Sequence, residues 1–221
     1  VYGGAPAFFD MRTGTTPMGA AETMLIDSAY AGVGRRLGLP VHAYMGLSDA
    51  KLPDAQAGAE TALGVLMAML AGVDVVSGPG MLNFVRTQSL EKLVLDAEII
   101  EMGRRLMRGV AFRNPTEAID TLRRHAADAS FLSAPETRAL FREEASYPGA
   151  VIDRGSEDDW NRSGRPDAPT RAHARVRELL ADPEVVAPDP QVVAELESIM
   201  ERDAHDHGVV ALPDWSARLR G

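Results

Sequence analysis

The sequence contains no cysteine. This excludes a disulfide framework, a thiolate metal site and a cysteine nucleophile, and it is typical of a reducing compartment, so a cytoplasmic location is expected. Long apolar runs are also missing. The longest, residues 63–76, is interrupted by Gly72 and Asp74 and is too short to span a bilayer, so no membrane segment is predicted.

Strong charge and metal-binding motifs are lacking as well. The formal charge is −9, with acidic and basic residues mixed along the chain, which predicts no nucleic-acid partner. There is no glycine-rich phosphate motif. His205 and His207 lie close in sequence, but no third ligand has a suitable spacing, so no metal site is predicted. His42, His125 and His173 are interpreted as structural or surface residues, and no residue is predicted to be catalytic.

The first half alternates strands and helices. Helices are expected at 20–37, at 55–71 with Asp54 as N-cap, and from the N-cap Ser89 to residue 108, and strands at 39–44 and 72–77. This βα rhythm predicts an α/β fold with a parallel sheet covered by helices.

The second half has a different character. Helices with proline at their first position are expected to start at 114–117, 133–136 and 189–191, with Ser133 among the capping residues. Residues 146–169 are interpreted as a long ordered loop and 203–221 as a polar tail. The predicted organisation is therefore residues 1–112 as βα units and residues 113–221 as a helical extension.

Polar residues are concentrated between the strand at 39–44 and the helix that follows it. Ser48 and Asp49 come first in this loop and are the preferred functional candidates, whereas Asp54, Gln56 and Glu60 suit capping and structural roles. Ligands bind at the carboxyl ends of parallel strands, so this loop is the predicted site.

Aromatic residues make up only 5% of the chain, so those near loops stand out. Phe8, Phe9, Tyr44 and Trp160 are suited to form a wall for a cation, although packing in the core is the more common role of such residues. Asp10 and Arg12 are suited either to hold a polar end of a substrate or to pair with each other.

Three segments together resemble the trimethylamine methyltransferase superfamily: Phe9-Asp10-Met11-Arg12-Thr13-Gly14, the run from Gly46 to Glu60, and Leu70-Ala71-Gly72-Val73-Asp74. The resemblance is strong over the first half of the chain, and the later helices match only in general character. It implies the carboxyl-terminal portion of a (β/α)8 TIM barrel followed by extra helices. The chain begins at Val1 in what reads as the middle of a fold, so it is interpreted as truncated.

The resemblance also implies an activity: transfer of a methyl group from a methylated amine to the cobalt of a corrinoid (cobalamin) carried by a partner protein. The namesake enzymes contain pyrrolysine, which this chain lacks, so it resembles the branch that uses quaternary amines such as glycine betaine or related betaines. The substrate-binding residues expected on this basis are Phe9, Asp10, Arg12, Tyr44, Leu47, Ser48 and Asp49. Among these, the aromatic faces and Asp49 are expected to hold the ammonium group, and Arg12 the carboxylate.

Two alternatives remain open. One is a barrel enzyme that acts on another small, anionic substrate, although no base or metal is identified for it. The other is a noncatalytic barrel fragment or binding module, since a partial barrel leaves strand edges open. The amine, the corrinoid protein and the oligomeric state are not predicted.

Overall fold

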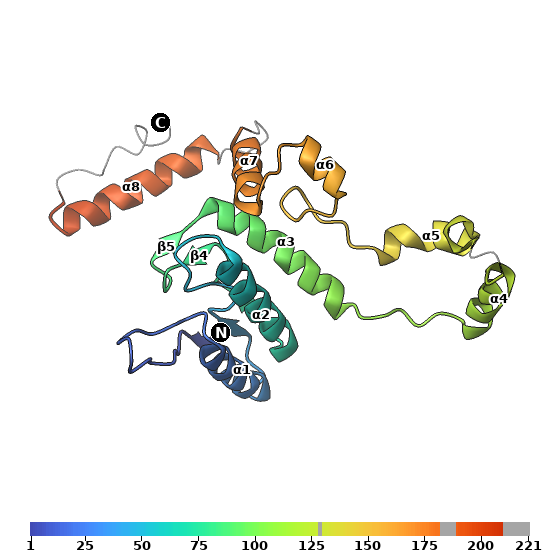
Figure 1. The fold of residues 1–221 in the computed structure, drawn as a ribbon. Helices are drawn as coiled ribbons and strands as arrows, with labels where there is room; N and C mark the ends of the chain where they lie inside the picture. Colours follow the sequence, from blue (N-terminus) through green and yellow to red (C-terminus); the bar gives the residue numbers. More distant parts are fainter. Residues whose placement is uncertain (128–129, 182–188, 210–221) are drawn as a thin grey trace. The chain divides into compact units, whose positions relative to one another are not determined.

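The computed structural model describes residues 1–127, 130–181 and 189–209 (Figure 1). The chain forms two units, residues 1–180 and 181–221. The elements of the first unit up to its third long helix are β1 (Tyr2–Gly4), α1 (Ala21–Arg36), β2 (Val41–Ala43), α2 (Ala55–Ala71), β3 (Val75–Val76), β4 (Met81–Leu82), β5 (Thr87–Gln88) and α3 (Leu90–Met107). The remaining elements of this unit are α4 (Pro115–His125), the 3-10 turn η1 (Ser130–Ser133), α5 (Pro135–Glu144), α6 (Glu157–Arg162) and α7 (Ala168–Leu180), and the second unit contains α8 (Pro190–Asp206).

Three strands form a parallel sheet in the order β1-β2-β3. Tyr2 pairs with Val41, and His42 pairs with Val75, so the strands follow one another across the sheet in chain order. Strands β2 and β3 are each reached through a helix, which is the usual crossover between parallel strands. The chain is thus a mixed helix and sheet structure, compatible with the α/β class predicted from the sequence.

One face of this sheet is covered by helices. Helix α2 contacts α1 on one side and α3 on the other (Figure 1). Met24 of α1 and Ala68 of α2 form one apolar cluster with Ala43 and Met45, which joins these two helices to β2. Tyr2 and Val41 lie against Gly34 of α1, where any side chain would clash with them.

The long helices begin where the sequence predicts. Asp54 caps α2 by accepting a hydrogen bond from the Ala57 N–H, and Ser89 caps α3 by accepting one from the Lys92 N–H. Asn114 and Asp189 cap α4 and α8, each before a proline at the first helical position. The strands are shorter than predicted, because only Val41–Ala43 and Val75–Val76 pair along the sheet.

Two predictions in the second half are wrong in part. Residues 146–169 are not a continuous loop, because they contain α6 and the start of α7. Ser156 accepts a hydrogen bond from the Asp159 N–H, and acidic residues fill the first turn, so end effects form a six-residue helix that has no apolar period. Ser133 does not cap α5; its hydroxyl donates to the Ser130 carbonyl within η1.

The hairpin β4–β5 was not predicted, because its strands have two residues each and carry no periodic signal. No helix among residues 1–127, 130–181 and 189–209 is long and apolar enough to cross a membrane. Residues 210–221 of the predicted polar tail lie outside the described part of the chain.

Candidate active site

The loop between β2 and α2 is held by Glu60 on the second turn of α2. One Glu60 carboxylate oxygen accepts the Ser48 hydroxyl at 2.6 Å and the Asp49 N–H at 2.8 Å. The other oxygen accepts the Gln56 amide at 2.8 Å. Ser48 is 0% exposed, and its hydroxyl also accepts the Ala50 N–H. Glu60 and Gln56, which the sequence assigns to structural roles, therefore set the conformation of the predicted site loop.

Asp49 connects this loop to the segment that enters α1. Its two carboxylate oxygens accept the N–H groups of Met18 at 3.0 Å and Gly19 at 2.9 Å. Asp49 is 5% exposed, and burial raises the pKa of its carboxyl, while the two N–H groups oppose that rise. Asp49 thus places a buried acid where the loops after β1 and β2 meet.

The turn after β3 packs against the same loop. The Met81 carbonyl accepts the Ser48 N–H at 3.1 Å, and the Ala50 carbonyl accepts the Asn83 N–H at 2.9 Å. A Cβ at Gly78 would lie 2.0 Å from the Met45 carbonyl oxygen and 3.0 Å from the Leu47 Cβ, so only glycine fits there. Leu47 is buried in this contact. The loops after all three parallel strands are therefore joined, as expected for a site at the carboxyl ends of a sheet.

The face of the sheet opposite α1 and α2 carries a second polar group. Because side chains alternate along a strand and Ala43 faces the helices, His42 lies on the opposite face. His42 Nε2 is 2.7 Å from the Ser77 Oγ, which follows β3, and its ring meets that of Tyr44 edge-on at 5.2 Å. Tyr44 was predicted from the sequence, whereas His42 and Ser77 were not predicted as site residues. The alternation of Val41 and Ala43 with His42 and Tyr44 is the signal that points to them.

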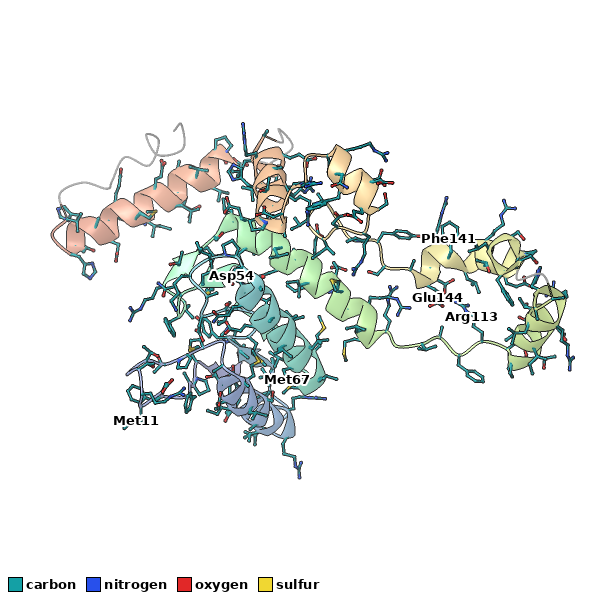
Figure 2. The ribbon with its side chains drawn as sticks, viewed as in Figure 1. Met11, Asp54, Met67, Arg113, Phe141 and Glu144 are labelled. Atoms are coloured by element: carbon teal, nitrogen blue, oxygen red, sulfur yellow. The ribbon has the colours of Figure 1, made fainter. Side chains whose placement is uncertain are left out.

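Asp10 and Arg12 form a pair at the tip of the loop between β1 and α1. The Arg12 Nε and Nη2 donate to the two Asp10 oxygens at 3.0 and 2.9 Å, and this lowers the pKa of Asp10 to about 2. The Arg12 side chain is 86% exposed, and Figure 2 shows its neighbour Met11 at the outer tip of the loop. Phe9 is 50% exposed beside them. The pairing alternative raised by the sequence is thus the one present in this structure.

Lys51 lies at the outer end of the site loop, where its ammonium group donates to the Asp49 carbonyl at 2.8 Å and stands 4.3 Å from the centre of the Phe84 ring. Asn83, Phe84 and Val85 all have positive φ, between 51° and 65°. This conformation is rare for a β-branched residue. Such strain is stored preferentially at functional sites, and no sequence motif indicates it here.

Trp160 and His207 belong to elements other than the strands and loops described above. Trp160 is on α6, where its indole N–H donates to the Pro166 carbonyl and its ring faces Arg165, so it forms no wall with Tyr44. The His207 side chain contacts Asp203 of α8. No group of three or more His, Asp or Glu residues placed to hold a metal ion occurs in the described ranges.

Comparison with known proteins identifies the family. The family model described as trimethylamine methyltransferase (MTTB) matches residues 1–208. Trimethylamine methyltransferase MttB of Methanosarcina barkeri is 33% identical over 203 residues, which are 91% of this chain and 40% of that protein. The glycine betaine methyltransferase of Desulfitobacterium hafniense (strain Y51) is 32% identical over 209 residues, which are 94% of this chain and 43% of that protein.

The chain therefore belongs to the trimethylamine methyltransferase family, as its sequence motifs predict. It spans about two fifths of the length of these curated relatives.

Proposed function

We propose that this chain is part of a methyltransferase that takes a methyl group from a quaternary amine, such as glycine betaine or a related betaine, and passes it to the corrinoid of a partner protein. The observation that carries this proposal is the family match over residues 1–208. Relatives named for trimethylamine and for glycine betaine are nearly equally similar to the chain, so identity alone does not select the amine.

The fold proposed for the complete enzyme is a (β/α)8 TIM barrel, with residues 1–112 as carboxyl-terminal βα units and 113–221 as a helical extension. Three parallel strands in sequential order, with the connecting helices on one face, support this proposal. In such a barrel the opposite face points inward, so Tyr44, His42 and Ser77 would line the interior at the catalytic end.

A quaternary ammonium suits this chemistry. When its methyl group is transferred to the reduced acceptor, the carbon–nitrogen bond breaks and its electron pair stays on nitrogen. The product is a neutral tertiary amine, so no proton donor is required. The protein must then position the methyl group and remove water from the cation.

The proposed binding residues follow from this requirement. Tyr44 and Phe9 would present aromatic faces to the ammonium group, and the buried acid of Asp49 would add a favourable field. Ser48 would hold the loop that carries Asp49 through Glu60, and Leu47 would pack that loop against the turn at Gly78.

Arg12 would hold the substrate carboxylate beside Asp10. A guanidinium group has five N–H donors, and only its Nε and one N–H of Nη2 are used by the contacts to Asp10.

Calorimetric titration of the complete natural enzyme tests the substrate class. Glycine betaine, proline betaine, carnitine and trimethylamine are compared, and tighter binding of at least one betaine than of trimethylamine is expected. The acceptor is tested with free cob(I)alamin, whose absorbance changes when it is methylated. Preference for trimethylamine over every betaine would overturn the quaternary-amine proposal.

Arg12→Lys separates the two ends of the substrate. It should weaken the binding of glycine betaine more than the binding of tetramethylammonium, because only the planar guanidinium can form two parallel hydrogen bonds with a carboxylate. Equal effects on both ligands would remove Arg12 from the proposed site.

A further inference from the structure

A buried ion pair lies behind the candidate site, between α2 and α3. Lys92 and Asp96, one turn apart on α3, have side chains that are 0% and 1% exposed. The Lys92 ammonium is 2.5 Å from Asp96 Oδ2 and donates to the Thr61 hydroxyl of α2 at 2.8 Å.

The pair is attached to the turn that follows β3. The same Asp96 oxygen accepts the Gly80 N–H at 2.7 Å, and Gly80 has a φ of 84°, so this turn has a left-handed backbone. The next residue, Met81, accepts the Ser48 N–H through its carbonyl. A continuous path of contacts therefore runs from Lys92 through Asp96, Gly80 and Met81 to Ser48.

The free energy of burying an ion pair indicates what the pair contributes to the protein. Taking two charges out of water costs about as much as their attraction returns, and apolar residues of similar volume often stabilise a protein equally well or better. Apolar residues, however, cannot accept the Gly80 N–H. Compared with apolar residues, the pair therefore contributes by fixing the position of the turn that contains Gly80.

We propose that Lys92 and Asp96 are positioning residues that fix the turn at 78–80 and, through Met81, the Ser48–Asp49 segment of the candidate site. The effect on backbone position is independent of the proposed function, whereas the effect on amine binding rests on it.

The test compares two double variants by amide hydrogen exchange in the complete enzyme. Lys92→Met with Asp96→Leu removes both charges and the acceptor of the Gly80 N–H. Exchange should become about tenfold faster in residues 78–82 and 46–50, while most of the global stability is kept. Lys92→Met with Asp96→Asn keeps an acceptor oxygen, so exchange should stay close to that of the natural protein. Residues 25–36 of α1 serve as the internal reference.

Steady-state kinetics with the preferred amine is the second measurement. The variant with Asp96→Leu (the leucine variant) should have a KM several-fold above that of the natural enzyme. The variant with Asp96→Asn (the asparagine variant) should have a KM close to the natural value. Thermal unfolding midpoints of both variants check that they are folded. If the natural enzyme turns over no amine, the proposed function fails, but hydrogen exchange still decides the positioning role.

Two results would overturn the proposal. One is unchanged exchange in either segment of a folded leucine variant, and the other is equal exchange in the leucine and asparagine variants. If the leucine variant does not fold, hydrogen exchange of the natural protein is the test of the positioning role. Its Gly80 amide should exchange at least about tenfold more slowly than an unstructured peptide, and comparable rates would overturn the role.

Discussion

Two aspartates, one on α1 and one on α3, are buried equally well but have opposite surroundings. Asp96 has an ammonium group and a backbone N–H as partners. Asp27 is 1% exposed, and neither of its oxygens has a hydrogen-bond partner in the described residues. Burial raises the pKa of Asp27 to about 7, because nothing nearby compensates the charged form. Burial alone therefore does not define a role for an acid; its partners do.

Asp49 is an intermediate case. It has two backbone N–H partners, and its carboxylate forms no ion pair in the described part of the chain. Burial raises the pKa of all three acids, and they differ in their partners: Asp96 has a cation and an N–H group on one oxygen, Asp49 has two N–H groups, and Asp27 has neither in the described residues. A single substitution can change the charge or the partner of each of these three aspartates.

The largest effect is expected for Lys92→Met alone. It leaves Asp96 buried without its cation, so the free energy of unfolding should fall by about 3–5 kcal/mol. Urea denaturation of this variant and of the Met/Leu double variant gives the comparison, and the double variant should recover most of the loss. Lys51→Met is the matched control, because Lys51 is exposed, and it should cost less than about 1 kcal/mol. Equal losses for the two lysines would show that the buried pair has no special energetic role.

Asp27→Asn should change how stability depends on pH. The folded-state pKa of about 7 is above the unfolded value of 3.8, so the natural protein binds an extra proton on folding between these values. Its stability should therefore fall as pH rises from about 4 to about 7, by at most about 4 kcal/mol, and stay low above that range. Asp27→Asn removes this slope.

Unfolding midpoints measured from pH 4 to pH 8 check the prediction, with Glu22→Gln on the exposed face of α1 as the control. The prediction would be contradicted if the natural protein and the Asp27→Asn variant showed the same dependence of stability on pH.

The smallest effect is expected for Asp49→Asn. An amide keeps one acceptor oxygen but turns an N–H donor toward one of the two backbone N–H groups, so stability should fall by about 1–2 kcal/mol. If Asp49 also favours the ammonium group as proposed, KM for a betaine should rise. Asp54→Asn is the matched control, because asparagine caps a helix about as well as aspartate. A KM that stays constant while stability falls would limit Asp49 to a structural role.

The sequence predicts local features well. The caps Asp54 and Ser89 and the helices that follow them come from contacts within one turn, which the sequence pattern records directly. The family was likewise evident from three short motifs, and the comparisons confirm it.

The partners of the site residues could not be predicted in this way. The Ser48–Glu60 bond joins residues 12 apart, and the Asp49–Met18 bond joins residues 31 apart. Sequence spacing indicates that Glu60 lies on a helix, but not which loop folds onto it. The interpretation of Ser48 and Asp49 as site residues stays a prediction, whereas their burial and their contacts are structural facts.

What the sequence determined by itself is thus the alternation of strands and helices in the first half, the capped starts of the long helices, and the family, but not the strand lengths, the β4–β5 hairpin or α6. These depend on interactions between residues close in the chain. Only the tertiary structure decided that His42 and Ser77 meet on the sheet face opposite the helices, and that Asp96 has a cation where Asp27 has none. The reason is physical: solvation and charge compensation depend on which segments pack together, and that packing is set by contacts across the whole unit.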